Sequence, residues 1–270
     1  MFDRLREKGF AVLYQSHAEA ILEKDFSEAA EEIERAIADI EVPITEIIGS
    51  GGGEAKGTQR MRRSLAELGW QKTNFDIRKI VNGVEREAIS HEIDHVKTFD
   101  KGVIALEIEW NNKDPFFDRD LENFKRLHAE GAMSAGVIIT RHTSLHEGMY
   151  GFVLRFAQEQ QIHSLEDLAR LDIVPTPKQR NEILKRVQRL RDPIEFAEAW
   201  ADKFVSDKYG EATTHWRKLL DRVTRGVGNP CPLILIGLPA SIVRFPTSAT
   251  REETAAAIEQ AAIESKDAEN

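Results

Sequence analysis

Short apolar runs alternate with amphipathic stretches along this chain, which predicts a β-sheet flanked by helices. The nearly continuous apolar runs at residues 135–140 and 232–237 are typical of strands buried on both faces. Asn82-Gly83 separates two alternating stretches, residues 74–81 and 84–90, and this dipeptide favours a two-residue hairpin turn. The pattern therefore predicts at least one hairpin and at least two buried strands.

A helix is predicted between the strand at residues 103–110 and the buried strand at 135–140. Its apolar residues recur at helical spacing, and Asp118 can cap its first turn. The stripe consists of Leu121, Phe124 and Leu127. Strand, helix and strand in this order form a βαβ crossover, so we expect a mixed sheet with helices on its faces. From residue 164 the chain is expected to be mostly helical.

The strand at residues 103–110 carries the candidate chemistry. Side chains alternate along a strand, so Glu107 and Glu109 share one face while Ile108 points into a core. Asp94 precedes the strand in a polar, turn-like segment, and an antiparallel pairing would bring it beside Glu107. Carboxylates this close repel one another unless a cation lies between them, which favours a Mg²⁺ site. The alternative is an amphipathic strand with a solvated acidic face.

A basic tract follows the glycine-rich segment at residues 49–57. The order Lys-Gly-Thr at residues 56–58 differs from the Gly-Lys-Ser/Thr of a phosphate-binding loop, so a flexible loop is the better interpretation. The loop leads into a helix predicted at residues 58–68, with Gly69 as its stop. The basic residues here are candidates for contacts with a phosphate backbone: Lys56, Arg60, Arg62 and Arg63.

Composition describes a soluble globular protein. The 270 residues are 41% hydrophobic and 31% charged, and the sequence has no apolar run that approaches the length of a membrane span. The N-terminus is charged and lacks the apolar stretch of a signal peptide, and Cys231 is the single cysteine, so we expect a cytoplasmic protein. A net charge of −9 disfavours a nonspecific polyanion binder, although clustered basic residues can still bind nucleic acid.

Several separated segments resemble the BglII/BstYI family of type II restriction endonucleases, over roughly residues 10–245. The order of these short segments along the chain carries most of the resemblance. They are Gly57-Thr58-Gln59 leading to Gly69-Trp70, Asp94 with Glu107-Ile108-Glu109-Trp110-Asn111-Asn112, Gly136-Val137-Ile138-Ile139-Thr140-Arg141, and Gly210-Glu211-Ala212-Thr213-Thr214-His215 through Asn229-Pro230-Cys231-Pro232.

The resemblance implies an α/β fold with a PD-(D/E)XK nuclease core, which is a central mixed sheet flanked by helices. It also implies a homodimer on double-stranded DNA that uses Mg²⁺ to cut a palindrome centred on GATC, of the RGATCY or AGATCT type. By position, Asp94 and Glu107 would be metal ligands. Glu109 would occupy the third catalytic position, where the usual pattern has Lys. This departure favours direct water activation or a second metal over a Lys-assisted step.

The family's base contacts would map onto two short stretches. Asn111, Asn112 and Lys113 directly follow the catalytic strand, and Asn can pair with adenine while Lys donates to guanine. Thr143 and Ser144 fall at a further specificity position, in a polar loop expected after the strand at 135–140.

We expect one endonuclease domain over residues 1–246, with a catalytic core at about 42–142 and helical and strand additions at 150–246. Residues 247–270 form an acidic, alanine-rich tail, expected to be flexible or a loose helix. Two other functions remain open. One is a structure-specific or repair nuclease on the same core, and the other is a DNA-binding module with a lapsed active site.

Overall fold

The computed structural model describes residues 1–49, 54–246 and 251–267. Residues 50–53, which hold much of the glycine-rich segment, lie outside the described residues. Contacts divide the chain into two compact units. Unit 1 comprises Met1–Asp39, Met61–His142 and Thr214–Pro239, and unit 2 comprises Ile40–Arg60, Thr143–Thr213 and Ala240–Asn270.

Unit 1 is built on a six-stranded mixed sheet with the strand order β1-β7-β6-β5-β4-β3. Its strands are β1 (Ala11–Gln15), β3 (Gln71–Val81), β4 (Val84–Phe99), β5 (Gly102–Glu109), β6 (Ala135–Arg141) and β7 (Leu233–Leu238). β5, β6 and β7 are parallel, whereas β1, β4 and β3 pair antiparallel with their neighbours. The predicted mixed sheet is confirmed, and it is completed by β1 and β7, which lie outside the predicted core at 42–142.

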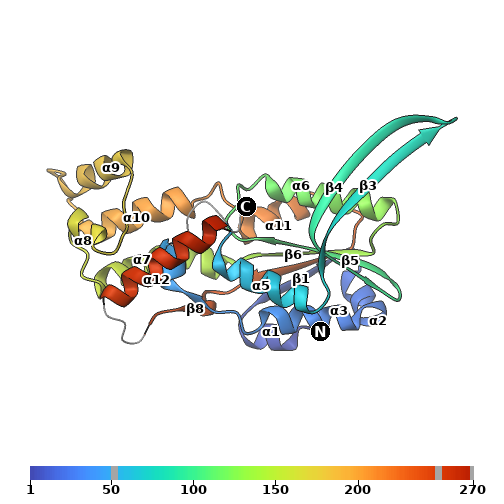
Figure 1. The fold of residues 1–270 in the computed structure, drawn as a ribbon, viewed down its shortest axis with the longest axis horizontal. Helices are drawn as coiled ribbons and strands as arrows, with labels where there is room; N and C mark the ends of the chain where they lie inside the picture. The colour runs from blue at the N-terminus through green and yellow to red at the C-terminus, as the bar shows by residue number, and fades with distance from the viewer. Residues whose placement is uncertain (50–53, 247–250, 268–270) are drawn as a thin grey trace. The chain divides into compact units, whose positions relative to one another are not determined.

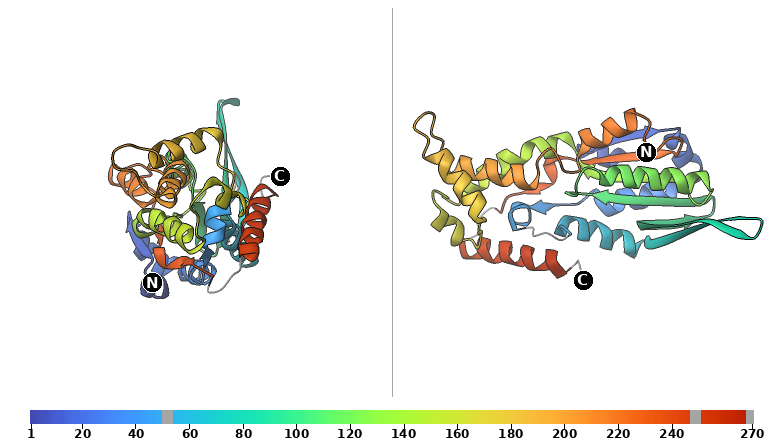
Figure 2. Two further views of the ribbon diagram at one scale, coloured as in Figure 1. Left: turned by 90° about the vertical axis from the view of Figure 1, so that its left-hand side faces the viewer. Right: turned by 90° about the horizontal axis from the view of Figure 1, so that it is seen from above.

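The hairpin predicted at Asn82-Gly83 is present and longer than expected. Asn82 has φ 52° and Gly83 has φ 77°, the pair of positive angles that a two-residue hairpin turn of this type requires. β3 and β4 extend beyond the other strands of the sheet (Figures 1 and 2). Because β4 runs to Phe99, Asp94 lies in a strand, and the expected turn-like segment at this position is wrong.

Helices cover both faces of the sheet in unit 1 (Figure 1). α6 (Phe116–Ala129) and α11 (Trp216–Thr224) pack on one face, where Phe124, Leu219 and Ile138 join the same buried cluster. α1 (Asp3–Glu7), α2 (Ala18–Asp25) and α3 (Ser27–Ile37) lie against the other face. There Glu32 of α3 accepts a hydrogen bond from Lys97 of β4 over 2.6 Å. The β5–α6–β6 crossover is therefore the predicted βαβ unit.

The start of α6 differs from the prediction. Pro115 is the N-cap residue, and Asp118 lies inside the first turn. Asp118 accepts a hydrogen bond from Arg222 Nε of α11 over 2.8 Å. Pro115 suits a helix start because its ring fixes φ near −65° and it has no N–H to leave unpaired. Asp118 therefore links two helices and caps neither.

Unit 2 contains α4 (Ile44–Gly49), α7 (Thr143–Glu159), α8 (Leu165–Ala169), α9 (Pro177–Val187), α10 (Phe196–Lys208) and α12 (Arg251–Asp267). β2 (Val42–Pro43) and β8 (Val243–Arg244) pair in parallel, and η1 (Ala240–Ile242) is a 3-10 turn. α5 (Lys56–Glu67) has residues in both units, and Gly69 follows it with φ 90°, as predicted for a helix stop.

Two segments of unit 2 are more regular than the sequence suggested. Thr143 begins α7, so the polar loop expected here is wrong. α12 occupies most of the acidic tail, so of the two structures expected for this tail the protein has the helix. Ile258 of α12 is 3% exposed and packs against α4 beside Gly49. The division into one domain and a flexible tail otherwise stays a prediction.

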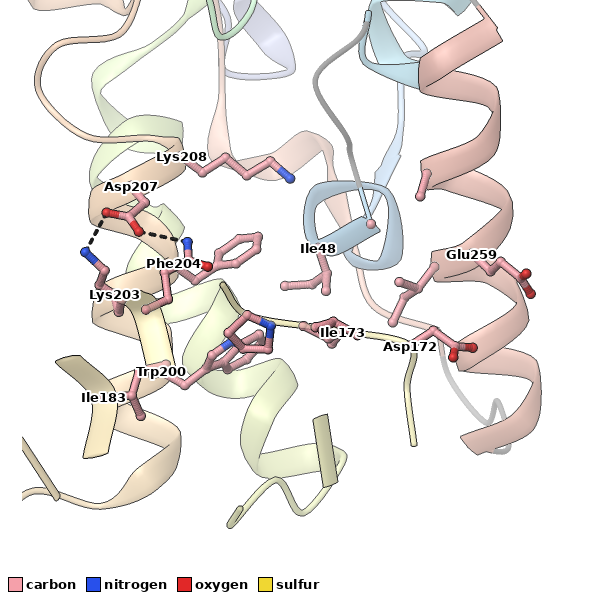
Figure 3. A pocket seen from close by; sticks show the side chains of 16 residues that line it. Ile48, Asp172, Ile173, Ile183, Trp200, Lys203, Phe204, Asp207, Lys208 and Glu259 are labelled. Carbon is pink, nitrogen blue, oxygen red and sulfur yellow. Dashed lines mark hydrogen bonds and ion pairs between the residues drawn. The ribbon is translucent and has the colours of Figure 1, made fainter. Parts of the chain in front are cut away.

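A cavity of about 490 Å³ lies within unit 2, between α4, α9, α10 and α12 (Figure 3). Ile48, Ile173 and Phe204 line it with apolar surface. Of the acidic residues that line it, Asp207 is paired with Lys203 Nζ at 2.8 Å and Gln179 Nε2 at 2.8 Å. Across the described parts of the chain, we find no helix with the length and apolar character needed to span a bilayer.

Candidate active site

Two carboxylates on β5 form the centre of the candidate site. Glu107 and Glu109 are each 3% exposed and share the face that carries Ala105, which packs in the cluster with α6. Ile108, on the opposite face, is also buried. The expected alternation is therefore present, but the acidic face is covered by protein. The alternative of a solvated acidic strand does not describe these residues.

Asp94 reaches the site from β4. His95 pairs with Leu106 in the antiparallel β4–β5 ladder, so Asp94 lies one step beyond that pair, opposite Glu107. The charge of Asp94 helps to raise the pKa of Glu107. The Asp94 side chain is 56% exposed, and Lys72 Nζ lies 3.9 Å from Asp94 Oδ1. The predicted meeting of Asp94 and Glu107 across neighbouring strands is thus present in the structure.

Burial and mutual repulsion both raise the free energy of the ionised carboxylates at this site. Burial raises the pKa of Glu107 well above its usual range, and Asp120, Asp94 and Glu109 raise it further. Burial, followed by the charge of Asp120, raises the pKa of Glu109 to about 9. Such shifts mean that these carboxylates ionise together only if a positive charge joins them. Clustered carboxylate oxygens are the ligands of hard divalent cations, so this donor set fits Mg²⁺.

Two side chains from outside the sheet hold Glu109. Asn112 Nδ2 donates a hydrogen bond to Glu109 Oε2 over 2.8 Å. Arg119 NH2 lies 3.7 Å from Glu109 Oε1 and 2.8 Å from Asp120 Oδ1, while its guanidinium sits 4.5 Å from the centre of the Phe116 ring. Arg119 thus supplies positive charge to the site and stays half-exposed.

Asp120 is a member of this cluster that the sequence reasoning missed. It lies on α6, is 0% exposed, and interacts with both Glu107 and Glu109. A signal was available, because Phe117, Asp120, Phe124 and Leu127 follow one another at intervals of three or four residues. An acidic residue within the apolar stripe of a helix is expected to be buried.

A comparison with family models identifies the family to which this chain belongs. The model described as restriction endonuclease BglII/BglIII matches residues 10–238. The chain belongs to this family. It is therefore a restriction endonuclease, a site-specific deoxyribonuclease whose substrate is DNA, and its mixed sheet with flanking helices is the restriction-endonuclease-like α/β fold. A comparison with curated proteins found no match.

In this BglII/BglIII-family endonuclease, the three residues predicted to read bases directly follow β5. Asn112 and Lys113 are exposed, whereas Asn111 is half-buried and its Oδ1 has no hydrogen-bond partner within the described chain. The Asn112 backbone is held at both ends, since its N–H donates to Thr214 Oγ1 at 3.1 Å and its carbonyl accepts from Thr214 N at 2.8 Å. The backbone at Asn112 is therefore fixed, while of the three side chains Asn112 and Lys113 are exposed and Asn111 is half-buried.

The predicted backbone contacts divide between the two units. Arg62 and Arg63 belong to unit 1 and are exposed. Burial lowers the pKa of His95, the neighbour of Asp94, and the charge of Arg62 adds a smaller contribution in the same direction. Lys56 and Arg60 belong to unit 2. Arg60 forms a two-pronged ion pair with Glu46 of α4, at 2.8 and 2.9 Å. One residue of the predicted basic tract is therefore already paired with a carboxylate.

Thr143 and Ser144 begin α7 in unit 2. Thr143 is half-buried and Ser144 is exposed, and Ser144 Oγ accepts a hydrogen bond from Ala240 N over 3.2 Å. Both side chains sit at a helix N-terminus, where backbone N–H groups favour anionic ligands. Their assignment to base recognition stays a prediction.

Proposed function

We propose that this restriction endonuclease is a Mg²⁺-dependent homodimer that cuts both strands of double-stranded DNA at a short palindrome centred on GATC. The observation that carries the metal requirement is the pair of buried carboxylates on β5, Glu107 and Glu109, with the exposed Asp94 of β4 beside them. A buried carboxylate set without a cation is strongly disfavoured, so these residues are arranged for binding a cation.

Asp94 and Glu107 would hold the metal, and Glu109 would take the third catalytic position. When bound, Mg²⁺ would lower the pKa of a coordinated water and offset negative charge that develops on the phosphate. The water oxygen would bond to phosphorus and one P–O ester bond would break, so that the departing oxygen takes a proton from solvent water while Glu109 accepts the proton of the attacking water. Glu109 must be ionised to accept a proton, and because burial raises its pKa to about 9, the bound cation would be what keeps it ionised near neutral pH.

Recognition would begin on the same strand. Asn111, Asn112 and Lys113 follow Glu109 directly, and their amide and ammonium groups suit the edges of adenine and guanine in the major groove. Thr143 and Ser144 would add contacts from α7. Lys56, Arg60, Arg62 and Arg63 on α5 would contact phosphates, which position the duplex without reading its sequence.

Run-off sequencing of digested plasmid DNA tests the proposed site and chemistry. With Mg²⁺ we expect discrete fragments whose ends map to GATC-centred palindromes, and no cutting with EDTA. Fragments with random ends, or cutting that requires branched DNA, would favour a structure-specific or repair nuclease. Binding without cutting under any divalent metal would favour a lapsed DNA-binding module.

The variant Glu107→Ala tests the assignment of the site. We expect cleavage to fall by at least about a thousandfold, because the metal loses a ligand, while DNA binding in a gel-shift assay persists or improves as negative charge is removed. Glu31→Ala, an exposed position on α3, is the matched control and should cut normally. A Glu107→Ala variant with full cleavage would refute the assignment.

A further inference from the structure

α9 and the turn after it concentrate positive charge on one surface of unit 2. Residues 177–192 contain six basic residues and two acidic ones, in a chain whose net charge is −9. Four of the basic side chains are exposed and have no carboxylate oxygen within 4 Å in the parts of the chain that the structure describes. These four, called the α9 basic surface below, are Lys178, Lys185, Arg189 and Arg191.

The opposite side of α9 attaches the helix to α10 of the same unit (Figure 1). Ile183 is 1% exposed, and Glu182 forms an ion pair with Lys203 of α10. Arg186 forms a second ion pair, with Asp202 of α10. The acidic residue of the helix is therefore already neutralised, and two ion pairs and a buried side chain hold the outward face in place.

The spacing of the α9 basic surface suits a row of phosphates. Lys178 and Lys185 are seven residues apart, which is nearly two helical turns, so they share one face and lie about 10 Å apart along the axis. Phosphates of one DNA strand follow one another at about 3.4 Å along the duplex axis, so this separation corresponds to about three phosphates. Arg189 and Arg191 continue the row beyond the end of the helix.

Helix stability does not explain this distribution of charge. Exposed arginines on α6 and α7 pair with a glutamate one turn away, as Arg126 does with Glu122 and Arg155 with Glu159. The helix dipole favours Lys185 in the last turn, but it disfavours Lys178, which lies in a first turn without acidic residues. A basic face without interspersed acidic partners is instead typical of a surface that binds polyanions.

The turn after α9 has a second feature that suits a nucleic acid. Leu190 is 103% exposed and lies between the exposed Arg189 and Arg191. A lone exposed leucine needs no partner by itself. Between two guanidinium groups, however, it matches the combination of arginine and apolar side chains with which proteins contact the minor groove.

DNA fits this surface better than a membrane does. An amphipathic helix that binds a bilayer inserts its apolar face, whereas the apolar Ile183 of α9 is buried within the protein. Duplex DNA is also the substrate class of the family to which the chain belongs.

We propose that the α9 basic surface is a second, sequence-independent DNA-binding surface that contacts phosphates flanking the cleaved site. It adds to the phosphate contacts proposed for α5. This inference rests on the DNA-cleaving activity of the family, and it does not depend on the proposed metal or on the proposed recognition sequence.

The salt dependence of DNA binding tests the proposal on the full chain. The fourfold variant combines Lys178→Gln, Lys185→Gln, Arg189→Gln and Arg191→Gln, and fluorescence anisotropy measures its binding in EDTA to a long duplex without GATC. Each phosphate contact contributes about 0.9 to the slope of log K against log salt concentration, so four lost contacts should flatten the slope by about 3 to 4. Binding at low salt should weaken by more than about 10-fold.

The matched control removes four exposed basic groups that are each paired with a carboxylate. It combines Arg4→Gln, Lys8→Gln, Arg155→Gln and Arg170→Gln. The two variants have the same net charge, so an effect of overall charge is common to both. Equal slopes and affinities in the two variants would overturn the proposal.

Duplex length tests whether the contacted phosphates flank the cleaved site. The wild type should bind a duplex of about four helical turns more tightly than one of a single turn, about 10 base pairs, and the fourfold variant should lose most of this gain. An undiminished gain in the fourfold variant would refute flanking contacts.

Vesicles of phosphatidylcholine and phosphatidylserine test the other partner. We expect no cosedimentation of the wild type at physiological salt. Cosedimentation that the fourfold variant loses, with DNA binding unchanged, would identify a membrane-binding surface and overturn the proposal.

Two half variants keep the test decisive if the fourfold variant does not fold. Lys178→Gln with Lys185→Gln, and Arg189→Gln with Arg191→Gln, should each give about half of the flattening. Single-turnover cleavage at saturating enzyme should keep the wild-type rate, and a slower rate with unchanged affinity would refute a binding role. The proposed function fails separately, if Glu107→Ala still cuts DNA.

Discussion

Asn112 connects two groups of residues with different proposed roles. It lies in the segment proposed to read bases, and its amide donates the 2.8 Å hydrogen bond to Glu109 Oε2. The amide cannot pair bidentately with adenine and keep that bond in the same geometry. Reading a base would therefore change the environment of Glu109, which is a direct route from recognition to cleavage.

The variant Asn112→Ala measures this connection. We expect single-turnover cutting of the cognate site to fall about 10- to 100-fold, the range expected for losing one bidentate base contact. Binding to noncognate DNA should change less than about twofold, since phosphate contacts dominate it. The measurements are quenched single-turnover cleavage and gel shift at one salt concentration.

Asn181→Ala, at an exposed position of α9, is the control for an asparagine removed elsewhere. If Asn112→Ala weakens cognate cutting and noncognate binding by the same factor, Asn112 acts through general affinity and the connection is refuted.

At the scale of elements, the contact between α6 and β6 sets where Arg119 and Asp120 lie relative to β5. Gly136 of β6 faces Phe124 of α6 so closely that a Cβ there would lie 2.3 Å from Phe124 Cδ2. The missing side chain lets α6 dock closely on the sheet beside Glu109. A glycine 27 residues after Glu109 thus helps to assemble the proposed site.

We predict that Gly136→Ala lowers both stability and cleavage. Overpacking a tight core contact costs about 1–3 kcal/mol, which should lower the melting temperature by several degrees. The rate of cleavage should fall further than stability alone explains, because α6 carries Arg119 and Asp120 away from Glu109. Calorimetry and single-turnover cleavage of folded protein give the two quantities.

Gly151→Ala is the matched control, because a Cβ at this position of α7 meets nothing within 4 Å. Alanine favours a helix over glycine by about 1 kcal/mol, so this variant should be as stable as the wild type or more stable. Full cleavage by Gly136→Ala at reduced stability would show that the α6 contact does not position the site.

At the scale of the whole molecule, the proposed activity requires two copies of the chain. The net charge is −9, so contact with DNA depends on local basic residues and not on overall attraction. A palindrome presents the same bases to each copy of a two-fold symmetric dimer, and each copy would then cut one strand.

Mixing wild-type chains with Glu107→Ala chains tests this arrangement. After subunit exchange, mixed dimers should have one working site and should convert supercoiled plasmid mainly to nicked circles. Gel electrophoresis resolves nicked from linear plasmid, and sedimentation should give twice the mass of one chain. The alternative result is linear product in proportion to the wild-type chains alone, with no additional nicked circles. That result would contradict a dimer that exchanges subunits and has one active site in each copy.

Local patterns were enough for the elements and for part of the site. The hairpin at Asn82-Gly83, the buried strand at β6 and the shared face of Glu107 and Glu109 follow from turn chemistry and from the alternation of side chains along a strand. Each depends on residues close together in sequence. The order of short segments then indicated the family, and the family match over residues 10–238 confirmed it.

Tertiary structure decided what the charged residues contact. Asp120 joins Glu109 only because α6 docks on β5, and Arg60 meets Glu46 only because α4 and α5 come together. Asp118 was predicted to cap a helix and instead binds Arg222, more than one hundred residues later. Periodicity shows which face of an element is buried, but it contains no information on what lies across that face. The sequence by itself therefore determined the strand, the acidic pair and the family, whereas the enclosure of that pair by α6 depends on long-range packing.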